Sequence, residues 1–161
     1  MKLTIKHFDE LTARELYEIV RARQDIFLME QNIVCRDYDG VDLDALHCFI
    51  SEGEQVVAYM RAFLADGEIH LGRFLTLRHG EGLGRRLMEE ALPIVKERLG
   101  YLPVTFHAQR HAEGFYQKLG FVTVSDVFLE EGIEHVIMSS ECSVVGASIA
   151  RPSAELEELQ I

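Results

Sequence analysis

The chain has 161 residues, 48% of them hydrophobic, and a formal net charge of -11 at pH 7. This size and composition are typical of one globular domain with a substantial core. The acidic charge argues against a broad nucleic-acid or anionic-membrane surface, and no apolar run approaches the roughly 20 residues that span a bilayer. The N-terminal segment lacks the apolar region of a signal peptide, and the three cysteines show no metal-like spacing. We therefore expect a cytoplasmic protein with reduced thiols.

The first half of the chain shows the signals of a strand, a helix and then a group of strands. Residues 2–8 alternate in polarity, as a strand does. Residues 12–15 have the form of a helix capping box, and the apolar stripe after them predicts a helix of about four turns. Residues 30–44 hold four aspartates without a clear period and predict an irregular loop. Three strands joined by tight turns are expected next, over residues 46–51, 56–64 and 69–77.

The second half of the chain predicts two helices and three more strands. A glycine-rich turn leads into a helix over residues 83–99, in which Pro93 should cause a kink. The later elements are expected at residues 104–108 (strand), 112–119 (helix), 121–129 (strand) and 133–138 (strand). The order β-α-β-β-β-α-β-α-β-β predicts an α+β fold with a mixed central sheet flanked by helices. We expect one domain over residues 1–140 and a loosely packed or short helical tail over residues 141–161.

The turn over residues 79–84, His-Gly-Glu-Gly-Leu-Gly, has the features of an anion-binding site. The first amides of a helix have no partners within the helix, the helix dipole favours negative charge there, and glycines let a phosphate approach the backbone. Arg78, Arg85 and Arg86 add positive charge nearby. The turn could equally be a simple link between strand and helix. It is neither a P-loop, since no lysine follows the glycines, nor a dinucleotide fingerprint, since the last glycine interval is wrong.

A second motif follows the next predicted strand, over residues 112–121, and reads Ala-Glu-Gly-Phe-Tyr-Gln-Lys-Leu-Gly-Phe. Together the two segments resemble the motifs Gln/Arg-x-x-Gly-x-Gly/Ala and Ala-x-x-Phe-Tyr-x-x-x-Gly-Phe of the GNAT superfamily of N-acetyltransferases. Residues 27–32, 37–42 and 132–135 resemble the ElaA-like branch of that superfamily. The resemblance covers residues 1–140. It departs from the first motif at His79, where the family usually has arginine or glutamine.

The resemblance implies a GNAT-like three-layer α/β/α fold and an acetyl-CoA-dependent N-acetyltransferase. Such an enzyme moves the acetyl group from acetyl-CoA to a primary amine of a small molecule or protein by direct attack. A non-catalytic acyl-CoA-binding or interaction module on the same scaffold is the alternative, and transfer of a longer acyl group also stays open. The partners implied are acetyl-CoA and an amine acceptor, with no nucleic acid and no membrane. The oligomeric state is open, with a homodimer among the alternatives.

The resemblance also implies the residues of a cofactor site. Leu75 and Leu77 would pair their backbone with the pantetheine arm, because in that family this strand and the next splay apart. Phe115 would flank the thioester. Amides of the turn and of the helix start would bind the pyrophosphate, namely those of Gly80, Glu81, Gly82, Leu83, Gly84 and Arg85.

Tyr116 is the candidate general acid, since a phenol with a pKa near ~10 can donate to a thiolate whose conjugate acid lies near ~8.5. The alternative is a tyrosine packed in the core. His107 is the candidate general base, although a histidine bonded within the sheet is the other reading; Glu30, Asp42 or an ordered water could also serve. The acidic loop could attract a cationic amine or be a solvated surface. No metal is expected, because no zinc spacing occurs among Cys35, His47, Cys48, His107 and His111.

Overall fold

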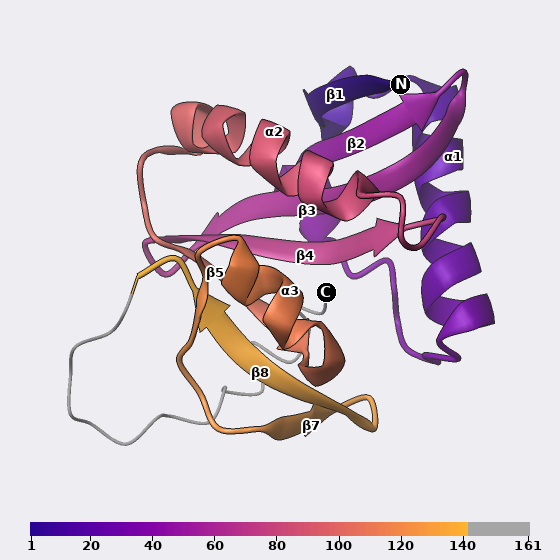
Figure 1. Ribbon diagram of the computed structural model, residues 1–161. Helices are drawn as coiled ribbons and strands as arrows, with labels where there is room; N and C mark the ends of the chain where they lie inside the picture. The colour runs from indigo at the N-terminus through magenta and orange to yellow at the C-terminus, as the bar shows by residue number, and fades with distance from the viewer. Residues whose placement is uncertain (142–161) are drawn as a thin grey trace.

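A mixed β-sheet forms the centre of the molecule in the computed structural model, which describes residues 1–141 (Figure 1). Within this range eight strands pair in the order β1-β2-β3-β4-β5-β8-β6, with β7 also on β8. Only β4 and β5 are parallel, so the expected mixed sheet is confirmed. Apart from Glu141, the tail expected over residues 141–161 lies outside the described residues. The strands are β1 (Lys2–His7), β2 (Leu46–Glu52), β3 (Gln55–Ala65), β4 (Glu68–Thr76), β5 (Val104–Gln109), β6 (Val122–Thr123), β7 (Phe128–Glu130) and β8 (Ile133–Ser139).

Three α-helices of the described chain pack on this sheet. The first, α1 (Ala13–Arg23), begins at the predicted capping box, where the Glu15 amide donates to the Thr12 hydroxyl at 3.1 Å. It continues into a π-helical segment, Gln24–Glu30, so the helical run is longer than the sequence predicts. The other two are α2 (Leu83–Leu99), with Pro93 on its exposed side, and α3 (Glu113–Lys118). None of the helices within residues 1–141 is long and apolar enough to cross a membrane.

The helices cover both faces of the sheet, which confirms the three-layer architecture (Figure 1). Successive side chains of a strand point to opposite faces. Met60 of β3 accordingly packs with Leu87 of α2 and Tyr116 of α3, whereas its neighbour Tyr59 packs with Ile19 of α1. The first core therefore lies under α2 and α3, and the second lies under α1 and its π-helical extension.

The strand expected over residues 121–129 is interrupted, and this is the main departure from the predicted elements. It forms the two short strands β6 and β7, with a bend between them. At the bend the amide of Ile137 donates to the hydroxyl of Ser125 at 2.7 Å, and that hydroxyl donates to the carbonyl of Asp126 at 2.8 Å. The serine side chain thus takes the place of a backbone partner in the ladder, which ends regular pairing there.

The sheet opens between β4 and β5, and this opening positions the site. The two strands pair only at Ile69↔Val104 and His70↔Thr105, although both strands run on past these pairs. In the open part, β4 carries a β-bulge against β3, where Arg73 has a φ of 55°. Such a φ is uncommon outside glycine, and bulges are over-represented next to active sites.

Candidate active site

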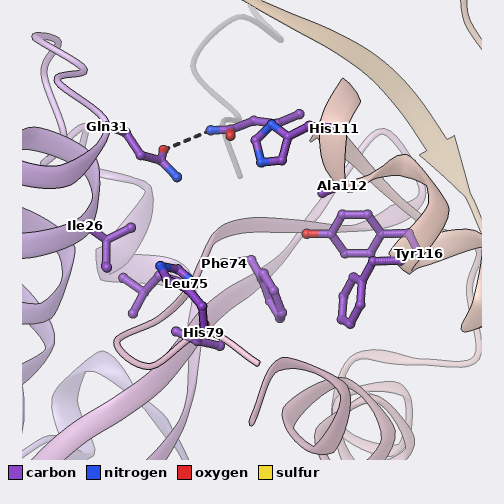
Figure 2. Close-up of a pocket in the computed structure, with 11 residues that line it drawn as sticks. Ile26, Gln31, Phe74, Leu75, His79, His111, Ala112 and Tyr116 are labelled. Atoms are coloured by element: carbon purple, nitrogen blue, oxygen red, sulfur yellow. Dashed lines mark hydrogen bonds between the residues drawn. The ribbon is translucent and has the colours of Figure 1, made fainter. Parts of the chain in front are cut away.

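A cavity of about 180 Å³ lies where β4 and β5 separate (Figure 2). Residues from both cores and from the glycine-rich turn meet around it, so it joins the two motifs that the sequence singled out. Its lining consists of Ile26, Gln31, Phe74, Leu75, Thr76, His79, Gln109, His111, Ala112, Phe115 and Tyr116. We call this cavity the reaction cleft.

Tyr116 lies in the reaction cleft with its hydroxyl pointing into the open space (Figure 2). The rest of the side chain is buried, with 2% of the residue exposed, and its ring contacts Phe106 at 4.7 Å between centroids. The two readings of this tyrosine are therefore compatible, because the ring packs in the core while the hydroxyl faces the cleft. Burial raises the pKa of Tyr116, so the phenol is protonated and able to donate at neutral pH.

The glycine-rich turn adopts the conformations that require glycine. Gly80 and Gly82 have φ values of 78° and 73°, and Gly82 is the N-cap of α2. The turn is linked to the π-helical segment by the His79–Glu30 contact, at 2.8 Å between Nε2 and Oε1. Gly80, Glu81 and Gly82, just before the helix start, are exposed. The three arginines that the sequence placed here pair with nearby glutamates, as Arg78–Glu81, Arg85–Glu89 and Arg86–Glu90.

Gly84 has a different role from the two glycines before it. A Cβ atom built on Gly84 would lie 2.9 Å from Cζ of Phe74 and 3.5 Å from Cζ of Phe115. Both rings line the reaction cleft. Glycine is needed here because the start of α2 packs directly against the aromatic wall of the cleft.

The edge of β4 differs in detail from the expected pantetheine contact. Leu75 is buried and lines the cleft. The amide of Leu77, however, donates to the carbonyl of Val57 at 2.9 Å, so this N–H is not free for a ligand. Phe74 and Thr76 also line the cleft, and the sequence reasoning missed them.

The structure does not bring the candidate bases into the lining of the reaction cleft. His107 is buried on β5, where its Nδ1 lies 2.9 Å from Oε1 of Glu130. This placement agrees with the reading of a histidine bonded within the sheet. Glu30 is held by His79, and Asp42 accepts hydrogen bonds from Arg23 at 2.7 Å and Arg61 at 3.1 Å.

Three aspartates of the acidic loop, Asp37, Asp39 and Asp42, are paired with arginines, which corrects for them both the reading as a solvated surface and the reading as an attractor for amines. The fourth, Asp44, is exposed, as the solvated reading has it. Arginines reach the loop from three elements, and the resulting ionic cluster holds the loop against the sheet. The pairs are Arg23–Asp37, Arg23–Asp42, Arg61–Asp39, Arg61–Asp42, Arg73–Asp37 and Arg73–Asp39, at distances of 2.7–3.3 Å. Desolvation alone would raise the pKa of Asp39 and Asp42, but the neighbouring guanidinium groups hold both pKa values below their usual range.

Two polar features near the cleft went unnoticed in the sequence. Gln109 donates from Nε2 to Oε1 of Gln31 at 2.9 Å, which links the end of β5 to the end of the π-helical segment beside the cleft (Figure 2). Glu130 is buried between two histidines. The position of Gln109 at the end of a predicted strand could have indicated a site residue. Glu130 gave no such signal, because in the sequence it looks like an ordinary residue of a hairpin turn. Within residues 1–141, no group of three or more histidine, cysteine or acidic side chains could hold a metal ion.

The chain is similar in sequence and in structure to known proteins of one acetyltransferase family. The family model described as Acetyltransferase (GNAT) domain matches residues 38–142. The chain is 34% identical to the ElaA protein of Escherichia coli over 84% of this chain and 93% of ElaA. The crystal structure of an acyl-CoA N-acyltransferase from Pseudomonas aeruginosa superposes with a TM-score of 0.82 at 34% identity, over 88% of this chain and 100% of that one. Crystalline ElaA of E. coli gives a TM-score of 0.81 at 32% identity, over 87% and 99% of the two chains.

A more distant structure shares the fold alone. The PaiA N-acetyltransferase of Thermoplasma acidophilum, crystallised in complex with coenzyme A, has a TM-score of 0.60 at 19% identity. The match covers 88% of this chain and 100% of that chain.

Proposed function

The chain belongs to the GNAT acetyltransferase family, and on this premise we propose that it transfers an acetyl group from acetyl-CoA to a primary amine of a small molecule or protein. The observation that carries the proposal is the Tyr116 hydroxyl, which points into a cleft at the open junction of β4 and β5. An acyl donor with a long thiol arm fits this junction, because a strand edge without a partner strand offers it backbone hydrogen bonds.

Residues around the cleft would hold three parts of acetyl-CoA: the pyrophosphate, the pantetheine arm and the thioester. The amides of the turn from Gly80 to Arg85 would hold the pyrophosphate at the start of α2. The backbone of β4 next to Leu75 would hold the pantetheine arm. Since backbone groups of successive strand residues point to opposite sides, and Leu77 bonds to β3, the groups of Thr76 face the open side. Phe115 would pack beside the thioester.

The chemistry needs a neutral amine, a polarised carbonyl and a proton for the leaving thiolate. Backbone N–H groups at the β4 bulge would polarise the carbonyl, since the bulge interrupts pairing in the open part of the strand. Tyr116 would donate its proton to the thiolate sulfur, because its hydroxyl faces the cleft. Burial raises the pKa of Tyr116 and so keeps the phenol protonated until the thiolate forms. The amine nitrogen forms the new bond to the carbonyl carbon as the carbon–sulfur bond breaks, and it loses one N–H proton to water, from which Tyr116 is reprotonated.

Replacing Tyr116 with phenylalanine tests the proposal. We expect kcat for thiol release to fall by about 10²-fold or more, the usual contribution of acid catalysis. Acetyl-CoA affinity in isothermal titration should stay nearly unchanged, because the ring still packs. Tyr101→Phe is the matched control, since this tyrosine is 84% exposed. Unchanged turnover in Tyr116→Phe would remove Tyr116 from the mechanism. Acetyl-CoA binding without turnover on a broad amine panel would instead favour the acyl-CoA-binding module.

A further inference from the structure

Glu130, at the end of β7, is a buried carboxylate with one unused oxygen. The residue is 5% exposed, and its Oε1 accepts a hydrogen bond from Nδ1 of His107 at 2.9 Å. Its Oε2 is buried without a hydrogen-bond partner in the described part of the chain. Nε2 of His135 lies 3.6 Å from this oxygen. Among residues 1–141 no lysine or arginine forms an ion pair with this carboxylate.

The tautomer of His135 determines whether its Nε2 can donate a hydrogen bond to Oε2 of Glu130. Nδ1 of His135 lies 2.8 Å from the carbonyl of Ile133, and a carbonyl only accepts, so Nδ1 carries the hydrogen. Burial lowers the pKa of His135, so the ring is neutral and Nε2 presents a lone pair. Oε2 of Glu130 and Nε2 of His135 are then two acceptors facing each other. A group with at least two hydrogens to donate would satisfy both.

A small cavity beside these two acceptors has room for such a group. Its volume is about 10 Å³, enough for one group the size of a water molecule. The lining is Phe27, Ile33, Cys35, Asp37, Arg73, Gln109, Glu130 and His135. Gln109 lines both this cavity and the reaction cleft. Asp37, the other carboxylate of the lining, already pairs with Arg73 at 2.7 Å.

We propose that this cavity receives the amino group of the acceptor and that Glu130 takes its proton. The inference rests on the proposed function. The group that fits is a primary ammonium on an unbranched carbon, because the cavity admits one water-sized group and offers two acceptors. One N–H proton passes to Oε2 of Glu130, and the freed lone pair forms the C–N bond as the C–S bond breaks. The second N–H proton leaves to water as the amide forms, Tyr116 gives its proton to the thiolate and is reprotonated from that water, and Glu130 later releases its proton to water.

Glu130→Gln tests this assignment, with Glu134→Gln as the matched control on β8, whose side chain is 55% exposed. In Glu130→Gln, kcat/KM for n-butylamine should fall by about 10²-fold or more, while acetyl-CoA affinity holds. The deficit should shrink as pH rises toward the pKa of the amine, because the amine then arrives already deprotonated. The other titratable or charged groups facing the carboxylate are present in both variants, so the difference between profiles reports Glu130. These groups are Cys35, Asp37, Arg73, His107 and His135.

A second measurement does not depend on turnover. Histidine-ring ¹⁵N spectra of the wild-type protein with free CoA should show a shift of the His135 Nε2 resonance on addition of n-butylamine. tert-Butylamine should leave it unshifted, because its branched carbon does not fit. An unmoved resonance together with equal rates in the two variants would overturn the inference while leaving acetyl transfer intact. A shifted resonance in a protein that transfers to no amine would support the site and refute the proposed function.

Discussion

Asp39→Asn would test whether the ionic cluster under the acidic loop stabilises the fold. Oδ1 and Oδ2 of Asp39 accept from Nη1 and Nη2 of Arg61 at 2.8 and 2.7 Å, and Oδ2 also accepts from Arg73 at 3.3 Å. The side chains of Asp39 and Arg61 are 4% and 0% exposed. Three arginines face three aspartates in the cluster. The asparagine therefore removes one of the carboxylates that face these buried guanidinium groups.

Breaking one partner of a buried ion pair costs about 3–5 kcal/mol, against a total stability of about 5–15 kcal/mol for a domain. We expect the free energy of unfolding of Asp39→Asn to be about 3–5 kcal/mol lower than that of the wild-type protein near pH 7. The pKa of Asp39 is held below its usual range, so the stabilisation is complete above an unfolded pKa of about 3.9 and is lost as pH falls through the lower folded value. The gap between wild type and variant should therefore shrink in acid.

Urea denaturation followed by circular dichroism at several pH values would measure both quantities. Glu54→Gln is the control, because its ion pair with Arg14 is exposed, at 72% and 65% of the two side chains. The loss in this control should stay below about 1 kcal/mol. A loss as small as this in Asp39→Asn, or a gap that does not change down to pH 3, would show that the cluster does not stabilise the fold.

Two further predictions concern the cleft and the response to acid. Gly84→Ala should lower kcat/KM for acetyl transfer more than Gly114→Ala, because its Cβ meets the Phe74 ring at 2.9 Å whereas a Cβ on Gly114 meets nothing within 4 Å. Steady-state kinetics on both variants would show it, and equal rates would contradict it. Burial lowers the pKa of His47, so the neutral ring is favoured in the fold and stability should fall as pH drops below an unfolded pKa of about 6.5. Urea midpoints between pH 8 and 5 should decline less in His47→Gln than in wild type, and parallel declines would refute this role.

The fold was largely predictable because its signals are local. Capping chemistry, strand alternation and turn residues lie within a few positions of one another, and they predicted the strands β1 to β5 and the three helices. Tertiary contacts decided the rest. The break at Ser125 depends on a hydrogen bond from Ile137, 12 residues away. The π-helical continuation of α1 has no local signal that separates it from an ordinary helix.

The candidate site was predictable only where residues act through the backbone or through a fixed motif. The glycine turn follows from φ values that glycine alone adopts readily, so Gly80 and Gly82 could be read from sequence. The role of a carboxylate depends instead on which partner the fold brings to it. Asp37 and Glu130 both look like loop residues, yet Arg73, 36 positions away, neutralises the first, and the second receives only histidines. A charge that the fold has already paired cannot receive an ammonium group, whereas a buried oxygen left without a donor can. The sequence therefore offered His107, Glu30 and Asp42 as bases, because the partners that hold these side chains in the fold cannot be read from the sequence.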